Sequence, residues 1–463
     1  ERKLIQFDVT QSEAIITSDE LEGMPVTEVS EVLRLQGGVT VDAGGGIHMR
    51  GGRTSEVSYM VDGVPMSDAY SGGIGIQVEN DNIQELQVIS GTFNAEYGKA
   101  LTGVVNMITK DGGNQFEGSI HTYAGDFQSN DSIYQDLTAF KIQDDYSISA
   151  NLSGPILNDK VTFYSSGRLN QSNGWLNGLQ TFTIYGDTVF KDENDNLFLD
   201  GDETQLKPYY KGLNDYESWS AQNKLTFNIF PGTIFKLNSI VNARRSSEYN
   251  HFLQYLEDGL ITNHNKGNFI GFNLSHSFSP VTFGQINISE NTFRFESYLF
   301  EDPKDPRYIT PDSIFGAQID NVIPDHIISQ YGDQVQYYPP YALYRAGVDN
   351  RRFERETKTR NYKFDVTSQI NKYNQLKFGI DITKHALFLD SYSILDSTQT
   401  DKIYSPKIPD KGSFTRSDYH YQPSELGLYI QDKIEYGDMI INMGLRFELF
   451  KPNAEIPKNI HEP

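Results

Sequence analysis

From Phe116 onward, hydrophobic and polar residues alternate in short runs, as they do in β-strands that have one apolar face. The clearest runs are Leu225/Phe227/Ile229, Leu376/Phe378/Ile380/Ile382, Leu426/Leu428/Ile430 and Met443/Leu445/Phe447/Leu449. We count about eleven such strands, centred near residues 121, 150, 165, 225, 238, 273, 290, 365, 380, 430 and 446. The larger part of the chain is therefore predicted to be one antiparallel sheet.

The connections between these strands alternate between short turns and long polar segments. Short turns are predicted at 155–160, 230–233, 279–282, 371–375 and 436–439, and long segments near 128–144, 172–217, 248–266, 299–358 and 392–423. A soluble β-sandwich has no reason to keep this rule, whereas a transmembrane barrel has short periplasmic turns and long outer loops. The pattern thus predicts a transmembrane β-barrel whose long loops lie outside the cell.

The first quarter of the chain has a different pattern, in which glycine clusters separate short apolar strands and two helical stretches. Ser18 is a helix-start signal, and Pro25 is expected to open a second helix that stops at Gly37. Short strands are predicted at 47–50, 57–61, 86–89 and 104–109. We expect an N-terminal segment over 1–14, a mixed α/β domain over 15–113 and barrel strands over 114–463.

The barrel is expected to be incomplete in this chain. About eleven strands is an odd number and too few to enclose a domain of roughly 100 residues. The last residues, 459–463, are polar and follow an outward strand, where a long loop should begin. The chain also starts at Glu1 with no targeting segment. We therefore expect it to be the N-terminal portion of a longer, processed polypeptide.

Composition narrows the class further. Aromatic residues make up 13% of the chain although only 37% of it is hydrophobic, which suits strands with one apolar face and rings at a membrane interface. No segment approaches about 18 consecutive apolar residues, so a transmembrane helix is not expected. The net charge of −23 argues against a nucleic-acid partner. The absence of cysteine removes disulfides and thiolate chemistry.

Four segments that follow one another in the first domain resemble the plug of TonB-dependent receptors. They read Arg-Gly-Gly at 50–52, Val-Asp-Gly-Val-Pro at 61–65, Ser-Gly-Thr-Phe-Asn-Ala-Glu-Tyr-Gly at 90–98 and Gly-Val-Val-Asn-Met-Ile-Thr-Lys at 103–110. The segments Tyr-Ile-Gln-Asp-Lys at 429–433 and Gly-Leu-Arg-Phe at 444–447 resemble barrel strands of the same family. The Phe-Asn-Ala-Glu-Tyr-Gly segment is more similar to the Oar-like branch, which is found with upstream carboxypeptidase-regulatory-like domains, than to the SusC-like glycan importers.

This resemblance implies a barrel of about 22 strands whose lumen is closed by the plug. It also implies outer-membrane lipid around the barrel, a periplasmic TonB protein that pulls on an N-terminal segment, and a transported solute or protein. Residues 4–9, Leu-Ile-Gln-Phe-Asp-Val, match the TonB-binding segment poorly. A structural, assembly or protein-export role with a surface or envelope protein partner therefore remains as the alternative function.

The resemblance assigns a plug signature to Arg50, Gly51, Gly52, Asp62, Gly63, Glu96, Tyr97, Gly98 and Asn106. It implies that Arg50 links plug to barrel by charge pairing, since a buried guanidinium needs carboxylate partners. For Arg50 and Glu96 a structural ion pair is the favoured interpretation, and a release latch is the alternative. The glycines are interpreted as tight turns at positive φ, not as a phosphate loop.

Two loops are candidate binding sites. Asp68, Tyr70 and Ser71 lie in a polar, aromatic loop of the plug that is either an outward substrate-contact apex or an ordinary connection. In a predicted outer loop, Asp192, Asn194, Asn196, Phe198 (through its carbonyl), Asp200 and Glu203 have the spacing of an EF-hand calcium loop. Leu197 replaces the usual turn glycine there. We expect Ca²⁺ at modest affinity, with a solvated acidic loop as the alternative.

No enzyme is predicted. The nine histidines are scattered, and neither an HExxH nor a GxSxG motif occurs. The sequence therefore favours energy-coupled transport through a plugged barrel. The long segments 299–358 and 392–423 are best placed to recognise a ligand or partner, but the sequence does not name the substrate.

Overall fold

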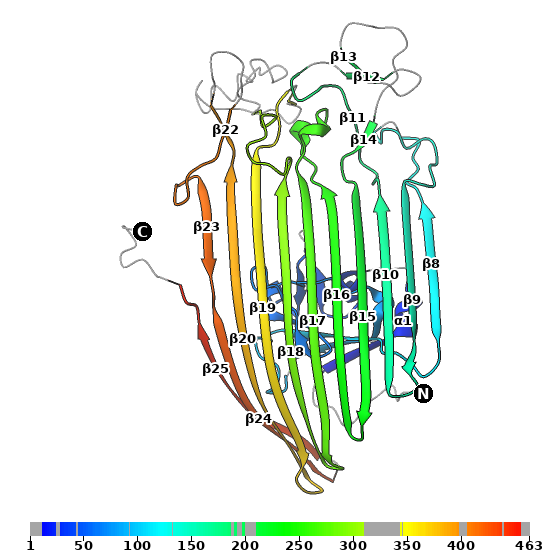
Figure 1. Cartoon of the computed structure of the whole chain (residues 1–463), viewed down its shortest axis with the longest axis vertical. Helices are drawn as coiled ribbons and strands as arrows, with labels where there is room; N and C mark the ends of the chain where they lie inside the picture. The colour runs from blue at the N-terminus through cyan, green and yellow to red at the C-terminus, as the bar shows by residue number, and fades with distance from the viewer. Residues whose placement is uncertain are drawn as a thin grey trace.

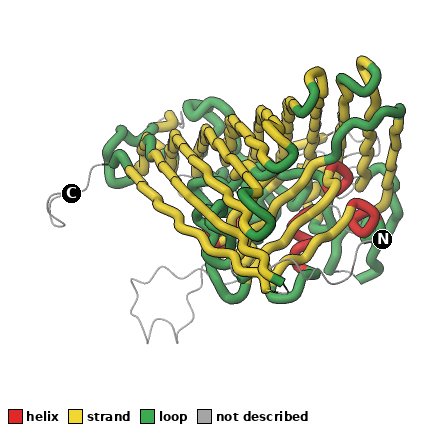
Figure 2. The backbone as a smooth tube through the Cα atoms, turned by 90° about the horizontal axis from the view of Figure 1, so that it is seen from below, coloured by secondary structure: helices red, strands yellow, loops and turns green. Residues whose placement is uncertain are grey.

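The computed structural model consists of a tall curved sheet, here called the wall, and a small domain on its concave side, here called the plug (Figure 1). It describes residues 12–24, 28–42, 45–91, 93–131, 133–186, 189–191, 197–199, 210–309, 343–344, 346–397, 405–437 and 439–454. Seen from below, the wall is a curved layer of strands, and the helices of the plug lie on one side of it (Figure 2).

The wall is an antiparallel sheet in which each long strand pairs with its neighbours in sequence. Its strands are β8 (Glu117–Gly125), β9 (Asp145–Leu157), β10 (Val161–Ser172), β15 (Tyr216–Phe230), β16 (Thr233–Ser247), β17 (Thr262–Ser279), β18 (Thr282–Tyr298), β19 (Arg351–Gln369), β20 (Asn374–Ser393), β23 (Arg416–Tyr421), β24 (Ser424–Tyr436) and β25 (Met439–Lys451). β23 and β24 follow each other along β20, so they form one crossing interrupted at 422–423. All eleven predicted strand positions are confirmed.

The two faces of the wall differ in chemistry. Apolar side chains at alternate positions point away from the plug and are exposed, as Leu445 is at 77%. The residues between them point toward the plug and are polar, as Asn238 and Gln222 are. This is the arrangement of a strand with lipid on one side and a filled lumen on the other. Within the described residues, β8 and β25 are not paired with each other, so the sheet is open.

The alternation of short and long connections is also confirmed. The short turns lie together at the lower end of the wall and the long loops at the upper end (Figure 1). The described parts of the long loops contain small hairpins and turns: β11 (Asn177–Leu179) with β14 (Tyr210–Gly212), β12 (Val189–Lys191) with β13 (Leu197–Leu199), β21 (Leu395–Ser397) with β22 (Ser405–Lys407), η3 (His251–Leu253) and η4 (Glu257–Gly259). They also bury two apolar clusters, around Ile184, Tyr308, Val348 and Ile394, and around Leu213, Leu253, Leu256 and Leu260.

The plug is a five-stranded mixed sheet with two short helices. Its elements are β1 (Ser12–Thr17), α1 (Ser18–Glu22), α2 (Val29–Arg34), β2 (Val39–Val41), β3 (Ile47–Met49), η1 (Thr54–Glu56), β4 (Val57–Val61), β5 (Val64–Pro65), η2 (Asn80–Asn82), β6 (Ile83–Ser90) and β7 (Gly103–Thr109). The sheet order is β1-β6-β7-β4-β5, and only β4 and β7 run parallel. Asp62 and Gly63, both at positive φ, connect β4 to β5 as a two-residue hairpin turn.

The hydrophobic core of the plug continues onto the wall. Val32, Leu33 and Leu86 are fully or almost fully buried in one cluster that also contains Ile240 of β16 and Phe269 of β17. At about 25 cal/mol per Å² of apolar surface, this shared burial stabilises the docked plug. The plug is therefore attached to the wall by apolar packing as well as by polar contacts.

The boundaries of the second helix differ from the prediction. α2 begins at Val29 and ends at Arg34, with Leu35 as its C-cap, and Pro25 lies outside the described residues. Gly38, not Gly37, has the positive φ that follows a helix end. The predicted strands β4, β6 and β7 are confirmed.

None of the helices in the described part of the chain is long and apolar enough to cross a membrane.

Candidate functional site

The candidate functional site is the interface between the plug and the inner face of the wall. Carboxylates of the plug there pair with lysines and arginines of the wall. We call this set the ion-pair belt; its plug members are Glu28, Asp62, Asp68, Glu79, Asp81, Glu96 and Asp111, and its wall members are Arg168, Lys224, Lys236, Arg244, Arg355 and Lys377. One further pair, Lys99 of the plug with Glu425 of β24, has the opposite polarity.

Arg168 of β10 is the most buried arginine of the belt. Its Nη1 donates to Glu79 over 2.7 Å, and its Nη2 donates to Asp81 over 2.6 Å. The turn η2 places both carboxylates toward the wall, where Ser220 also donates to Glu79 at 2.9 Å. Burial raises the pKa of Glu79 and outweighs the opposing effect of Arg168 and Ser220. Buried charges of this kind require partners, so Arg168 is needed wherever η2 is docked.

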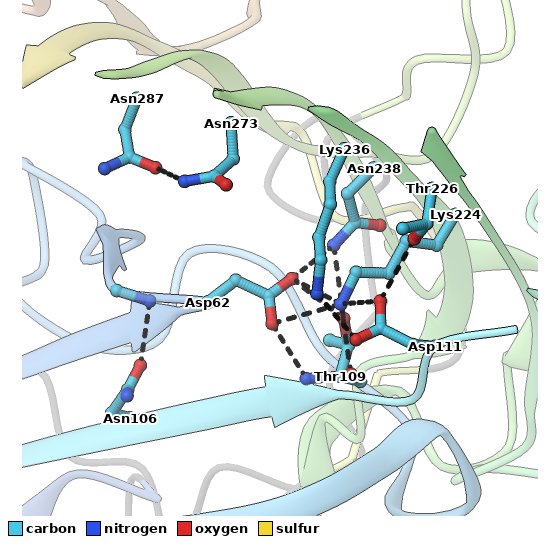
Figure 3. A network of polar contacts seen from close by, with 11 residues as sticks. Asp62, Asn106, Thr109, Asp111, Lys224, Thr226, Lys236, Asn238, Asn273 and Asn287 are labelled. Carbon is cyan, nitrogen blue, oxygen red and sulfur yellow. Dashed lines mark hydrogen bonds and ion pairs between the residues drawn. The ribbon is translucent and has the colours of Figure 1, made fainter. Parts of the chain in front are cut away.

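Asp62 and Asp111 form a second group with two lysines of the wall (Figure 3). Lys224 Nζ lies 3.3 Å from Asp62 and 3.1 Å from Asp111, and Lys236 Nζ lies 2.6 Å from Asp111. Asp62 also accepts from Thr109 N at 3.0 Å and from Asn238 Nδ2 at 3.0 Å. Burial alone would raise the pKa of Asp111, but Lys224 and Lys236 outweigh it and lower that pKa. This group ties the β4–β5 turn and the end of β7 to β15 and β16.

Asp68 joins residues 68–75, here called the upper plug loop, to β19. Its carboxylate is 3% exposed and accepts from Ser71 Oγ at 2.7 Å and from Arg355 Nη1 at 2.5 Å. Burial would raise the pKa of Asp68, but Arg355 and the hydrogen bonds of the loop outweigh it and lower that pKa. Tyr70 packs on the same guanidinium, 4.5 Å from ring centroid to Cζ. The three candidate contact residues Asp68, Tyr70 and Ser71 are thus together, against the wall.

Glu96 pairs with Lys377 of β20. Burial would raise the pKa of Glu96, but the lysine outweighs it and lowers that pKa. Arg446 of β25 donates to the carbonyls of Ala95 and Glu96 at 3.3 Å each. A Cβ at Gly98 would lie 2.4 Å from the Arg446 guanidinium, so glycine leaves room for that arginine. Tyr97 packs inside the plug against the cluster of Met60, Ile89 and Val104.

The buried, wall-paired guanidinium expected for Arg50 is not what the structure shows. Arg50 is exposed, has φ +49°, and among the described residues makes no ion pair. Its side chain lies beside Gly91 of the plug. Gly51 has φ +78°, and a Cβ at Gly52 would clash with Thr102 at 2.1 Å. The Arg50-Gly51-Gly52 segment therefore forms a turn of the plug. The pairing of plug with wall is made by the residues of the ion-pair belt instead.

Asn106 has a structural contact within the plug. Its Oδ1 accepts from Gly63 N at 3.0 Å, and its Nδ2 donates to Gln87 at 3.0 Å. The first of these bonds connects β7 to the β4–β5 turn (Figure 3), and the second connects β7 to β6.

The calcium candidates cannot be placed as a set. Asp192, Asn194, Asn196, Asp200 and Glu203 lie outside the described residues, and only the backbone of Phe198, in β13, is described. β12 and β13 pair in antiparallel register, with Lys191 opposite Leu197. Among the residues that the structure does describe, no group of three or more His, Asp or Glu could hold a metal ion.

Two cavities adjoin the belt. One of about 450 Å³ lies between the plug and β15 to β20, and Asp62, Glu96, Lys224, Lys363 and Lys377 are among its lining residues. A larger one of about 1060 Å³ extends from the Ser71–Gly75 side of the upper plug loop to β9, β10, β15 and β16. Both are lined by polar side chains from plug and wall, so water and polar solutes have space along this interface.

The belt residues of the wall were missed by sequence analysis. The sequence does contain an indication of them. In β10, Arg168 lies at one of the alternate positions that are mostly polar, whereas Phe163 and Leu169 lie at the intervening positions that face outward. Arg355 and Lys377 lie in the polar phase of β19 and β20 in the same way. A charged residue in the middle of such a strand marks the luminal face. The sequence alone does not say which plug residue it meets.

Comparison with known proteins agrees with this architecture. Residues 6–105 match the family model of the TonB-dependent receptor plug domain. The chain is 28% identical over 198 residues to the TonB-dependent transporter Oar of Myxococcus xanthus, covering 40% of this chain and 18% of that protein. It is 28% identical over 181 residues to a probable TonB-dependent siderophore receptor, PirA, of Acinetobacter baumannii, covering 34% of this chain and 23% of that protein. The chain spans less than a quarter of the length of these relatives.

Solved structures show the same fold. The ferripyoverdine receptor of Pseudomonas aeruginosa superposes with a TM-score of 0.62 at 14% identity, covering 96% of this chain and 52% of that one. The outer-membrane transporter YddB of Escherichia coli superposes with a TM-score of 0.60 at 13% identity, covering 95% of this chain and 56% of that one. At this identity the likeness concerns the fold.

Proposed function

We propose that this chain is part of a TonB-dependent receptor, whose plug domain residues 6–105 match, and that the whole protein transports a solute through the barrel when the plug is displaced. The wall lies in the outer membrane with its apolar face toward lipid. A periplasmic TonB protein would supply the force by pulling on the N-terminal side of β1. The substrate would enter from the end that carries the long loops.

The observation that carries this proposal is the ion-pair belt. Ion pairs such as Glu79 with Arg168 and Asp68 with Arg355 join the plug to the wall, and within the described residues no strand of the plug sheet pairs with a wall strand. The more exposed pairs of the belt, such as Lys236 with Asp111, can exchange their partners for water at small cost. The buried Glu79–Arg168 pair and the apolar contacts of the plug with Ile240 and Phe269 cost more to separate, so they are the contacts that an applied force must break. The interface can therefore open and close again while the wall stays intact.

The edge position of β1 suits a pulled element. Among the described residues β1 pairs on one side only, with β6, in antiparallel register from Ser12 opposite Ser90 to Thr17 opposite Glu85. A force on the chain before Ser12 acts first on this ladder. Separation of β1 exposes β6, and β6 follows directly from η2, which carries Asp81 of the belt.

The experiment begins with the natural protein purified from its own outer membranes. Small molecules that co-purify with it are identified by mass spectrometry, and their uptake is measured in cells with and without the gene for TonB. Transport predicts uptake that needs both this protein and TonB. Equal uptake in the TonB mutant would contradict the proposal.

A second candidate function is a scaffold or protein-export role with an envelope or surface protein partner. It is favoured by the described parts of the outer loops, which bury clusters around Tyr308 and around Leu256. Folded loops present a fixed surface, and fixed surfaces suit protein partners. A protein that co-purifies in stoichiometric amount, together with a phenotype that does not need TonB, would favour this role over transport.

For the outer loop at 192–203 we propose a structural Ca²⁺ held by Asp192, Asn194, Asn196, the Phe198 carbonyl, Asp200 and Glu203. The support is the spacing of the oxygen ligands. Bound calcium would neutralise the acidic residues of this loop and fix its shape at the outer mouth.

A further inference from the structure

A row of residues that face the lumen lies directly above the plug on four neighbouring strands. Phe295 is opposite Arg355, Arg355 is opposite Leu389, and Leu389 is opposite Tyr419. Residues opposite each other on antiparallel strands share one face, and Arg355 contacts the plug, so the whole row faces inward. The adjacent inward row consists of Phe293, Thr357, Leu387 and Tyr421. We call these two rows together the aromatic shelf.

Arg355 lies at the centre of the shelf among aromatic rings. Its Cζ is 4.5 Å from the ring centroid of Tyr70, 5.0 Å from that of Phe293 and 5.8 Å from that of Phe295. Tyr419 and Tyr421 stack on each other with centroids 5.4 Å apart. Tyr70 is 45% exposed and Tyr421 is 39% exposed, so part of each side chain is accessible to a ligand.

Most of the hydrogen-bonding capacity of Arg355 is unused. A guanidinium has five N–H donors, and within the described part of the chain Arg355 makes one hydrogen bond, from Nη1 to Asp68 Oδ2. Its side chain keeps 13% exposure. A ligand carboxylate could therefore approach Arg355 and form the two-bond pair that suits this side chain.

Asp68 would remain satisfied if Arg355 left it. Its carboxylate also accepts from the backbone N of Tyr70 at 3.2 Å, from the backbone N of Ser71 at 3.3 Å and from Ser71 Oγ at 2.7 Å. Hydrogen bonds of this kind stabilise the ionised form of a buried carboxylate. Exchange of Arg355 to a ligand thus removes the ion pair of Asp68 but leaves its carboxylate with three hydrogen bonds from the plug loop.

We propose that the aromatic shelf binds a ligand that carries a planar ring and a carboxylate, and that this carboxylate replaces Asp68 on Arg355. The upper plug loop then loses its ion pair to β19 when the substrate arrives. This proposal rests on the transport function, because it names the substrate class and the step by which the substrate loosens the plug. Asn291 of β18 would still donate to Pro65 O at 3.4 Å and to Met66 Sδ at 3.8 Å, in the chain just before this loop.

The test uses three probes on the purified natural protein: benzoate, which has ring and charge; benzamide, which has the ring alone; and acetate, which has the charge alone. Binding is measured by ligand-observed NMR. Benzoate is expected to bind at least about tenfold more tightly than benzamide, the effect of one charge-assisted hydrogen bond. Acetate is expected to compete with benzoate for the site. Benzoate is expected to bind more tightly than acetate, because acetate has no ring to stack on the aromatic side chains.

The same samples report on the plug through hydrogen exchange of the loop amides, which include Asp68 N bonded to Gly73 O and Gly72 N bonded to Asp68 O. Benzoate should speed exchange of these amides, and benzamide should not. Arg355→Gln should abolish the preference for benzoate, whereas Arg355→Lys should keep part of it. Arg360→Gln, an outward-facing arginine of the same strand, is the matched control and should change nothing.

Equal binding of benzoate and benzamide by the unaltered protein would overturn the proposal, and this result needs no variant to fold. Slower exchange of the loop amides on adding benzoate would also overturn it, since the ligand would then fix the loop. The two hypotheses fail separately. Uptake that needs TonB without benzoate binding rejects the shelf alone, and benzoate binding with TonB-independent uptake rejects the transport function alone.

Discussion

Arg168 in the middle of β10 donates to Glu79 of the plug over 2.7 Å, and neither side chain is more than 11% exposed. Glu79 belongs to the plug and Arg168 to the wall, so their contact contributes directly to the attachment of the plug to the wall. Loss of one partner from a buried pair leaves an unpaired charge and costs about 3–5 kcal/mol. This pair is therefore a sensitive place to alter the attachment of the plug.

Arg168→Ala is expected to loosen the plug by about 3–5 kcal/mol, because Glu79 and Asp81 lose their shared partner. The measurement is hydrogen exchange of the amides of η2 and β6 in the purified protein, with the wall strands as internal reference. Arg360→Ala on the lipid-facing side of β19 is the control, and no change is expected there. Equal exchange in both variants would show that Arg168 does not hold the plug.

Asp62 allows a finer comparison, because its backbone has φ +50° and its carboxylate accepts four polar contacts. Asp62→Ala should destabilise plug docking by about 2–4 kcal/mol, since it loses hydrogen bonds and places alanine in a left-handed conformation. Asp62→Asn should cost less than half as much. Asparagine tolerates this backbone, and a flip of Asn238 can offer it an oxygen that now has no partner.

The measurement for the two Asp62 variants is limited proteolysis and hydrogen exchange at the β4–β5 turn. A larger effect of Asp62→Asn than of Asp62→Ala would contradict the role given to backbone and hydrogen bonds, and would indicate that the charge itself dominates.

The belt should tolerate mild acid. Asp68, Glu96 and Asp111 have lowered pKa values in the folded protein, so their contribution is present above the ordinary carboxyl pKa and is lost only as pH falls through the lower, folded value. Glu79 has a raised pKa, so protonation on acidification relieves its buried charge and has the opposite sign. Plug docking, followed by hydrogen exchange, should thus be nearly constant from neutral pH to about pH 5.

A steep loss of docking between neutral pH and pH 5 would contradict this expectation. It would indicate that the belt carboxylates lose their charge while still far above their ordinary pKa range.

Calcium should bind the outer loop with modest affinity, because the loop has oxygen ligands at EF-hand spacing but lacks the turn glycine. Isothermal titration should give one Ca²⁺ site that Asp192→Ala and Glu203→Ala each remove. Asp131→Ala, in a different outer loop, serves as the control. Absence of heat in the unaltered protein would reject the site.

The wall could be predicted well because lipid imposes a two-residue period on every strand. Leu445 and Phe447 are apolar for that reason alone, and the pattern can be recognised without any knowledge of neighbours. The interruption at 422–423 could not be predicted in this way. Pro423 has no N–H to donate, so the strand breaks into β23 and β24 there.

The plug-to-wall contacts could not be predicted, because each joins residues far apart in the sequence. Glu96 and Lys377 are 281 positions apart, and nothing local to either indicates the other. For Arg50 the sequence predicted a contact that the structure does not have. The resemblance to the family implied a buried ion pair, whereas Arg50 lies in an exposed turn. Sequence periodicity determines which face a residue occupies, but only the folded chain determines its partner.

The claim that transport needs plug and wall to separate can be tested with engineered disulfides. We call a disulfide between plug and wall the plug lock and a disulfide between two wall strands the wall lock. The chain has no cysteine, so Asp81→Cys with Ser149→Cys, whose present side chains hydrogen-bond at 3.0 Å, would give one disulfide between plug and β9. Ser165→Cys with Asn223→Cys, opposite each other on β10 and β15, joins two wall strands and is the matched control. We predict that the oxidised plug lock abolishes uptake of the co-purified solute and that reduction restores it, while the wall lock has no effect. Full uptake through a quantitatively cross-linked plug would contradict the account.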